Sequence, residues 1–292
     1  MGTSVSIDGV LVDPGTASVP VMDRGFLYGD SAFEVTRTYG GQPFALGAHL
    51  VRLRRSCERL GIAVGAPDDA LRAEIAAALD AAANPESYVR VIVTRGVTEI
   101  GLGVGQGQTT RRIVVVLPLP AQPAALYEDG VELATVMTAR SLDGTGAAGA
   151  KASNYLPNIL SLASARARGG YEALSVGAGG EILEGATSNV FIVRDGTVWT
   201  PPLELGILEG ITRGLVLDAA RDEGVEVEQR LFFPHDLYTA AEAFITSSLR
   251  EVVPVVRADG VVLGDGRPGA LTRRLHAAFR RCAEDVLASE RG

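Results

Sequence analysis

The stretch Gly149-Ala150-Lys151-Ala152-Ser153-Asn154-Tyr155 contains the only lysine of the chain. The sequence has 27 lysine and arginine residues in total, and all except Lys151 are arginine. Arginine can replace lysine at a solvated surface, but it does not lose its proton or form a Schiff base, whereas a desolvated lysine does both. Lys151 is therefore the first candidate for a chemical role. The alternative is that an arginine-rich chain retained one lysine by accident.

The composition predicts a globular protein that acts on small molecules. The 292 residues are 47% hydrophobic and 21% charged, and this length favours two domains. A formal net charge of −8 argues against nucleic-acid and anionic-membrane partners. We see no signal peptide and no apolar run of about 18 residues, so we expect a cytoplasmic protein without a membrane span. Cys57 and Cys282 are far apart and the histidines are dispersed, so neither a disulfide framework nor a metal site is expected.

The first half of the chain combines hairpin strands with two helices. Asp8-Gly9 between two short apolar runs predicts a hairpin, and alternation in residues 32–39 predicts a strand with Phe33, Val35 and Arg37 on one face and Glu34 and Thr36 on the other. Apolar residues at helical spacing predict a helix at 47–60, with most of its arginines solvated. The further expected elements are a helix at 67–83, strands at 87–94 and 112–117, and a glycine-rich loop over a site at 96–107.

Three prolines between Leu117 and Pro123 predict a domain boundary, because proline continues neither a helix nor a central strand. We therefore expect an N-terminal domain at 1–117, a linker at 118–126 and a C-terminal domain at 127–292. The second domain is expected to be rich in β-hairpins, with glycine turns at 179–180 and 195–196. The remaining predictions are strands at 131–137, 172–176, 181–183, 189–193, 197–200, 225–229, 243–246 and 252–256, helices at 158–168, 210–223 and 270–287, and a small-residue loop at 144–149.

A Schiff-base lysine either attacks a carbonyl substrate or holds pyridoxal 5'-phosphate (PLP), whose ring accepts electrons. PLP also needs a carboxylate for its ring nitrogen, and an arginine and a helix N-terminus for its phosphate. Glu184 is a candidate carboxylate, and Gly210-Ile211-Thr212-Arg213 opens a predicted helix. Thr246-Ser247-Ser248 could add a hydroxyl. Each signal alone also fits an ordinary surface or turn residue.

These motifs, taken in order, resemble the fold-type IV PLP enzymes, that is, the class IV aminotransferases. The resemblance runs from about Asp23 to Pro254. It implies an α+β fold of two domains, with a smaller N-terminal α/β domain and a larger, β-barrel-like C-terminal domain with helices. It also implies a homodimer with its active site near the interface. The matching stretches are 23–37, 49–53 with Ser56, 151–155, 184–191, 210–213 and 244–255.

The resemblance also implies a role for each matching residue around the cofactor. Lys151 would form the Schiff base and shuttle the proton, and Glu184 would pair with the ring nitrogen, which must stay protonated to accept electrons. Tyr155 would hydrogen-bond the ring hydroxyl, although its spacing from the lysine departs from many branched-chain members. Leu208 would pack against the ring. The implied phosphate contacts are Arg52, Ile211, Thr212 and Ser248.

The residues that indicate the substrate match more than one subgroup of the family. Tyr88 and Arg90 match the branched-chain pattern, in which the tyrosine helps bind the α-carboxylate, and Tyr28 and Phe33 also fit it. Val35 stands where branched-chain enzymes usually have glycine, and it is closer to the D-amino acid and (R)-amine transaminases. An Arg-x-His clamp, typical of D-amino acid enzymes, is missing after Arg95. The implied substrate-contacting residues are Tyr28, Phe33, Val35, Arg37, Tyr88, Arg90 and Leu249.

We therefore rank a branched-chain-like transaminase first, a D-amino acid or (R)-amine transaminase second, and an aminodeoxychorismate lyase third. Each transaminase would transfer an amino group from a small-molecule donor to a 2-oxo acid by ping-pong kinetics. Two alternatives lie outside the family. A cofactor-free Schiff-base aldolase would need alternating β/α units, which the hairpin-rich second half does not predict. A non-catalytic binding protein would not explain the single lysine.

Overall fold

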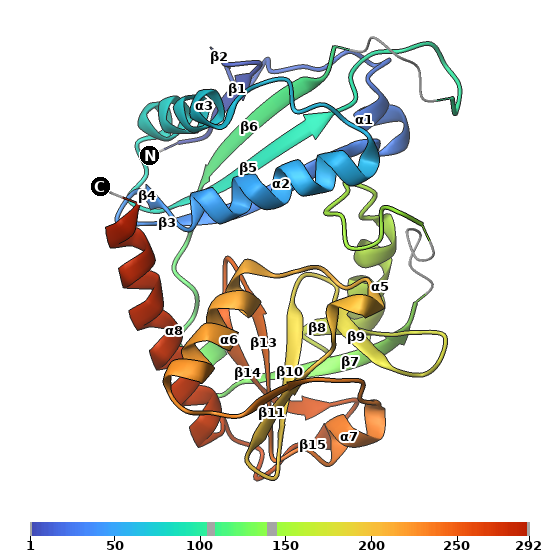
Figure 1. Ribbon diagram of the computed structural model, residues 1–292, viewed down its shortest axis with the longest axis vertical. Helices are drawn as coiled ribbons and strands as arrows, with labels where there is room; N and C mark the ends of the chain where they lie inside the picture. Colours follow the sequence, from blue (N-terminus) through green and yellow to red (C-terminus); the bar gives the residue numbers. More distant parts are fainter. Residues whose placement is uncertain (1, 104–108, 139–144, 291–292) are drawn as a thin grey trace. The chain divides into compact units, whose positions relative to one another are not determined.

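The computed structural model describes residues 2–103, 109–138 and 145–290 (Figure 1). The chain folds into two compact units, of which the first comprises residues 1–120 and 150–154 and the second residues 121–149 and 155–292. The chain thus leaves the first unit within the stretch predicted as a linker. It returns to the first unit for residues 150–154, the segment that contains Lys151. Residues 104–108 of the predicted glycine-rich loop and Gly144 of the predicted small-residue loop lie outside the described residues.

The first unit contains an antiparallel sheet with the strand order β2-β1-β6-β5-β3-β4. The predicted turn between β1 and β2 is confirmed, since Asp8 and Gly9 have φ angles of 53° and 86°. Two such positive φ angles are typical of a tight hairpin turn. The strands are β1 (Ser4–Ile7), β2 (Val10–Val12), β3 (Ser31–Tyr39), β4 (Gln42–Pro43), β5 (Ser87–Thr94) and β6 (Arg111–Pro118).

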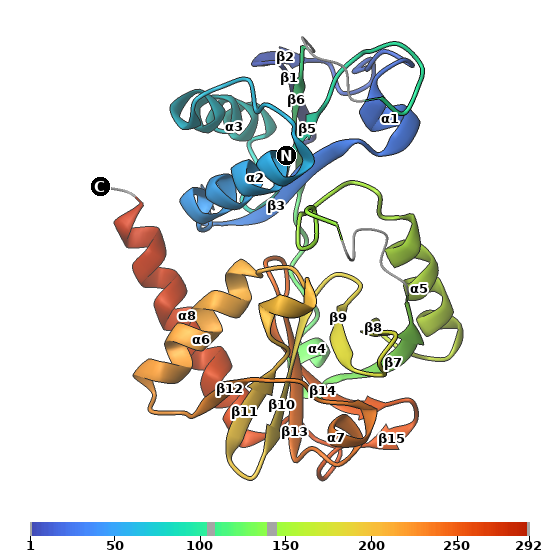
Figure 2. The same cartoon turned by 45° about the vertical axis from the view of Figure 1, so that its right-hand side comes forward.

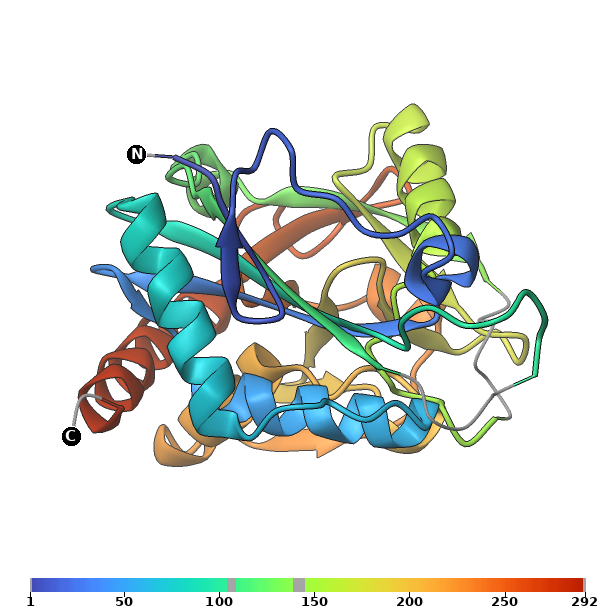
Figure 3. The ribbon, with the colours of Figure 1, turned by 90° about the horizontal axis from the view of Figure 1, so that it is seen from above.

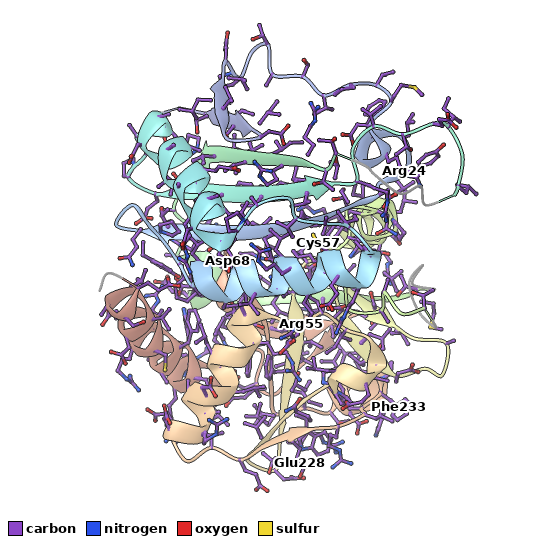
Figure 4. All side chains as sticks on the ribbon, turned by 45° about the horizontal axis from the view of Figure 1, so that its top comes forward. Arg24, Arg55, Cys57, Asp68, Glu228 and Phe233 are labelled. Atoms are coloured by element: carbon purple, nitrogen blue, oxygen red, sulfur yellow. The ribbon has the colours of Figure 1, made fainter. Side chains whose placement is uncertain are left out.

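Two helices cover one face of this sheet (Figures 1 and 3). They are α2 (Leu46–Leu60) and α3 (Asp68–Ala82), both close to their predicted positions. Leu50, Leu53 and Cys57 of α2 are buried against the sheet, whereas Arg55 lies on the opposite, exposed side (Figure 4). The amphipathic pattern of α2 therefore determines which face of β3 becomes core.

A short helix, α1 (Arg24–Tyr28), was not predicted from the sequence. Asp23 caps it by accepting a hydrogen bond from the Gly25 N–H, and Gly29 ends it in the left-handed conformation. Both are ordinary capping signals. With only five residues between the caps, the apolar spacing gives no helical pattern to detect.

The second unit contains a mixed, curled sheet with the order β12-β11-β10-β13-β14-β7-β8-β9, with β15 beside β14. Asp195 and Gly196 have φ angles of 51° and 82°, which confirms the predicted β10–β11 hairpin. The strands are β7 (Val131–Met137), β8 (Glu172–Val176), β9 (Ile182–Gly185), β10 (Asn189–Arg194), β11 (Thr197–Thr200), β12 (Val227–Gln229), β13 (Glu242–Ser247), β14 (Glu251–Ala258) and β15 (Val261–Val262). The predicted α+β class, with a barrel-like second domain, is confirmed.

Helices complete the second unit (Figure 2). α5 (Leu156–Ala167) connects the parallel strands β7 and β8, and α6 (Ile211–Asp222) packs against α8 (Ala270–Ser289) beside β13. The sequence did not predict the short elements α4 (Ala125–Glu128), η1 (Leu203–Leu205) and α7 (Pro234–Tyr238). Among the described residues, no helix is both long and apolar enough to span a membrane.

Candidate active site

The backbone around Lys151 is bonded to β3 and α2 within the first unit. The Lys151 carbonyl accepts a hydrogen bond from the Phe33 N–H (3.0 Å), and the Lys151 N–H donates one to the Ser56 hydroxyl (3.1 Å). Ala152 forms an antiparallel bridge with Ala32. The lysine Nζ lies 4.6 Å from the centroid of the Phe33 ring. These contacts fix the lysine backbone and place its amine against an aromatic face.

Five of the predicted substrate residues share one face of the first-unit sheet. Val35 lies opposite Arg90, and Arg37 lies opposite Tyr88, in the β3–β5 register. Residues directly opposite each other in an antiparallel pair project to the same side. The Arg90 guanidinium lies 3.9 Å from the centroid of the Phe33 ring. The face therefore combines aromatic and apolar surface with two cations.

The other face of β3 carries an ion-pair cluster under α2. The Arg52 Nε and Nη2 donate hydrogen bonds to the two carboxylate oxygens of Glu34, each over 2.7 Å. The His49 Nδ1 lies 2.7 Å from Glu34 Oε2. All three side chains are buried. Since Glu34 holds the guanidinium fork by two parallel bonds, the orientation of Arg52 is fixed before any ligand arrives.

The charges of this cluster follow from burial and pairing. Burial alone would raise the pKa of Glu34, but the charge of Arg52 and hydrogen bonds from Arg52 and His49 outweigh burial and lower this pKa to about 2. Burial lowers the pKa of His49 below its ordinary value. At neutral pH the imidazole is therefore neutral, and its Nδ1 donates because an ionised carboxylate only accepts. The His49 Nε2 is buried and has no hydrogen-bond partner among the described residues.

Glu184 lies within β9, whereas the strand predicted at 181–183 would have ended just before it. Its Oε2 accepts a hydrogen bond from the Leu208 N–H (3.0 Å), while the Leu208 carbonyl accepts one from the Asn189 Nδ2 (2.9 Å). A Cβ added to Gly210 would lie 1.9 Å from the Asn189 Oδ1, so only glycine fits beside this amide. The Leu208 peptide is thus clamped between the two side chains, and it orients the Glu184 carboxylate.

The start of α6 fits the phosphate of the predicted cofactor. Gly210 is the N-cap residue and offers no side-chain cap, so the first N–H groups of the helix, including those of Ile211 and Thr212, receive no capping bond from that side chain. Thr212 is 2% exposed, and its hydroxyl has no hydrogen-bond partner among the described residues. The buried Thr246 hydroxyl of β13 likewise has no hydrogen-bond partner among the described residues. Buried hydroxyls without partners, together with a helix N-terminus, suit a bound phosphate.

Residues 248–250 form the turn between β13 and β14, so the predicted contacts Ser248 and Leu249 share one short segment. Glu251, the next residue, is buried and has a φ angle of 59°, which is rare for a non-glycine residue. Its carboxylate contacts the His276 Nε2 (2.7 Å) and the Arg280 Nε (2.8 Å) of α8. Backbone strain of this kind persists only where the surroundings fix it, and it is common at functional sites.

The two predicted tyrosines lie at helix ends. Tyr28 is the last residue of α1, and its exposed ring lies 4.9 Å from the Arg24 guanidinium. Tyr155 directly precedes α5 in the second unit. These positions do not themselves identify a ligand, so the roles of Tyr28 and Tyr155 stay predictions.

Each unit carries part of the predicted site. The first unit holds Arg52 and Lys151 together with the substrate face of β3 and β5. The first unit also holds Tyr28, and the second unit holds Tyr155, Glu184, Leu208, Ile211, Thr212, Ser248 and Leu249. The Glu34–His49–Arg52 cluster was not predicted from the sequence. A signal existed, because Glu34 alternates with Phe33 on β3 and the spacing of His49 and Arg52 places them on one side of a helix.

Comparisons with known proteins agree on one family. The family model described as Amino-transferase class IV matches residues 31–258. A Methanocaldococcus jannaschii protein provisionally named a branched-chain-amino-acid aminotransferase is 35% identical, covering 94% of this chain and 95% of its own. A D-alanine aminotransferase of Bacillus licheniformis is 30% identical, over 94% of this chain and 95% of its own. The structure of an Escherichia coli branched-chain amino acid aminotransferase superimposes with a TM-score of 0.91 at 30% identity, covering 97% of this chain and 95% of the other.

Proposed function

The chain belongs to the class IV aminotransferases, which use PLP, and within this family we propose that it transfers amino groups between branched-chain-like L-amino acids and 2-oxo acids. The observation that carries this proposal is the position of Lys151. The only lysine of the sequence lies on a backbone segment bonded to β3, and its amine lies against Phe33 on the proposed substrate face. An amine held in this way suits a Schiff-base residue, and no arginine could replace it.

We propose a role in cofactor binding for each residue that the family resemblance singled out. Arg52, the N–H groups of Ile211 and Thr212, and Ser248 would bind the phosphate, and the unpartnered Thr212 hydroxyl supports this assignment. Leu208 would pack against the ring and Tyr155 would bind its hydroxyl group. Glu184 would bind the ring nitrogen, and the Leu208 N–H holds its carboxylate ready for that contact.

Bound PLP supplies an electron sink for the pair of electrons that remains when the substrate loses its α-proton. The protein supplies the base and the charges. The amine of Lys151, once freed by the amine of the substrate, would take the α-proton and later deliver it to the C4′ carbon of the cofactor. Glu184 would keep the ring nitrogen protonated, because an ionised carboxylate favours the charged form of its partner.

The residues of the β3–β5 face suit a substrate that combines a carboxylate group with an apolar side chain. Arg37 and Arg90 would bind carboxylate groups together with Tyr88, while Phe33 and Val35 would contact the side chain. Leu249, in the β13–β14 turn, and Tyr28 are the remaining proposed contacts. The branched-chain names of the Methanocaldococcus and Escherichia coli proteins support the same class.

A D-amino acid or (R)-amine transaminase is the second candidate. Val35 stands where the family resemblance implies glycine in branched-chain enzymes, and a D-alanine aminotransferase is 30% identical over nearly the whole chain. An added side chain at this position favours a smaller substrate or the other stereochemical arrangement.

We also propose a homodimer, supported by an apolar stripe on α5. Leu156, Ile159 and Leu160 are spaced so that they lie on one side of the helix, and they are 64%, 60% and 61% exposed. Such a stripe is unfavourable in water unless another surface covers it.

A cytoplasmic location is proposed as well, because the two cysteines are free.

The near-ultraviolet and visible spectrum of the purified protein tests the function. We expect the band of lysine-bound PLP, which excess L-leucine should convert to that of the pyridoxamine form. Conversion by D-alanine alone would replace the first candidate with the second. Conversion by neither amino acid would contradict both amino-acid substrates and favour an amine or a chorismate-derived substrate. A spectrum without such a band after PLP addition would contradict the cofactor assignment.

A further inference from the structure

Arg250 joins two segments of the second unit that are distant in sequence. Its Nε donates a hydrogen bond to the hydroxyl of Ser247 (3.0 Å), the last residue of β13 directly before the β13–β14 turn. Its Nη2 donates to the Thr187 hydroxyl (2.6 Å), in the loop between β9 and β10, and to Glu172 Oε2 (3.0 Å) of β8. A single guanidinium fork therefore contacts the turn, the loop and the strand.

Both joined segments carry proposed cofactor or substrate contacts. The loop at residues 186–188 connects Glu184 on β9 to Asn189 on β10, the two side chains that clamp Leu208. The turn at residues 248–250 contains Ser248 and Leu249. A displacement of either segment would therefore move a proposed contact to the phosphate, the ring nitrogen or the substrate.

The ion pair beneath these segments is buried. The side chains of Arg250 and Glu172 are 16% and 1% exposed. Burial would lower the pKa of Arg250, but the charge of Glu172 and the contact with Tyr171 outweigh burial and raise it. The Thr187 hydroxyl donates to Glu172 Oε2 (2.6 Å), so the carboxylate also holds the loop. Buried ion pairs contribute little net stability, so the geometric role of this pair is the more informative one.

The backbone on the far side of Arg250 is fixed as well. The Arg250 carbonyl accepts a hydrogen bond from the Tyr127 hydroxyl (3.2 Å), and the Tyr127 ring stacks on His276 with a centroid distance of 5.2 Å. His276 also contacts the carboxylate of the strained Glu251. The turn is consequently held on two sides. The Arg250 side chain is bound to β8, and the backbone at Arg250 and Glu251 is held by contacts with α4 and α8.

We propose that Arg250 is a positioning residue, which holds the Ser247–Leu249 segment in register with the Thr187 loop so that the phosphate and substrate contacts are preformed. This inference rests on the proposed function, because it assigns Ser248 and Leu249 to the same site. Arginine is suited to this role and lysine is not, since only the planar fork reaches Ser247, Thr187 and Glu172 at the same time.

The test compares Arg250→Lys with Arg257→Lys, a control on β14, the strand that follows the turn, where the arginine side chain is 45% exposed. Lysine at position 250 keeps a charge for Glu172 but loses the bridge. We expect the melting temperature of Arg250→Lys to stay within about 3 °C of wild type, while PLP leaves the holoenzyme about tenfold faster and KM for the amino donor rises about tenfold, with kcat changed less than about twofold. Arg257→Lys should match wild type in all four measurements.

Ser247→Ala provides a second variant, which removes one acceptor without changing the buried charge. It should reproduce the faster PLP release and the higher KM to a smaller extent. If Arg250→Lys only lowers the melting temperature, or if it fails to fold and Ser247→Ala behaves as wild type, the positioning role is wrong. A wild-type protein without the band of lysine-bound PLP would instead contradict the proposed function, which is a separate result.

Discussion

Arg52 and Glu34 form a two-pronged ion pair between α2 and β3, with both N–H···O distances at 2.7 Å. The pair lies on the face of β3 opposite the proposed substrate residues. It therefore links the folding of the first unit to the orientation of the arginine that we propose for phosphate binding. The same pair makes the stability of the protein depend on pH.

Glu34→Gln should lower the free energy of unfolding at neutral pH. It should also make this free energy depend less on pH in the acid range. The pKa of Glu34 is lowered from 4.5 to about 2, so the unfolded chain takes up this proton first as the pH falls. The stabilisation, about 3 kcal/mol, is complete above pH 4.5 and is lost between pH 4.5 and about 2. Urea unfolding at a series of pH values measures it. The control is Glu58→Gln, which changes an exposed carboxylate on α2. If the free energy of unfolding of Glu34→Gln falls with decreasing pH as steeply as that of wild type, this assignment is wrong.

Lys151→Arg should keep the fold and abolish turnover. The described hydrogen bonds of residue 151 to Phe33 and Ser56 use only its backbone, so the substitution leaves them in place. We expect the transamination rate to fall at least about a thousandfold, because arginine forms no Schiff base. Borohydride reduction followed by peptide mass spectrometry gives an independent measurement. PLP should be fixed on the peptide containing Lys151 in wild type and on no side chain of Lys151→Arg. Retained turnover would exclude the lysine chemistry.

Charged residues on α5 should separate the proposed dimer. Ile159→Glu together with Leu160→Glu places two carboxylates on the exposed apolar stripe, where burial would strip them of water. We expect light scattering to show a dimer for wild type and at least a tenfold weaker self-association for the double variant. Leu231→Glu, at a 49% exposed leucine outside α5, should remain dimeric. A dimer that survives the double substitution would place the interface elsewhere.

Local patterns predicted the elements well. The alternation of residues 32–39 placed Phe33, Val35 and Arg37 on one face, and the register of β3 with β5 confirms that arrangement. The turns at Asp8 and Asp195 were also confirmed, because the residues of a hairpin turn determine its backbone conformation.

Features that depend on packing between distant elements were not predicted. Glu34 is 18 residues from Arg52, and the network of Arg250 reaches Glu172 across 78 residues. Periodicity can place Glu34 on one face of a strand and Arg52 on one side of a helix, but it does not show which distant groups pair. Such pairs form only after a helix packs on a sheet or two loops meet. The predicted phosphate role of Arg52 rests on the family resemblance, and its pairing with Glu34 was recognised only in the structure.

Gly210→Ala and Gly214→Ala should have opposite effects on the same helix. The φ angle of Gly210 is −68°, which alanine adopts readily, so only space is at issue. A Cβ at Gly210 would lie 1.9 Å from the Asn189 Oδ1, whereas one at Gly214 meets no atom outside its own helix within 4 Å. We expect Gly210→Ala to lower the free energy of unfolding by about 1–3 kcal/mol. Gly214→Ala should raise it by about 1 kcal/mol, because alanine favours a helix interior.

The two variants should also differ in the proposed active site. Displacement of Asn189 by Gly210→Ala would release the Leu208 carbonyl, and Leu208 would then hold the Glu184 carboxylate less firmly. PLP should therefore leave Gly210→Ala several times faster than wild type, whereas Gly214→Ala should retain it as wild type does. Denaturant titration and the decay of the PLP band on dilution measure the two effects. Equal cofactor release from both variants would show that the clamp does not control Glu184, whatever the change in stability.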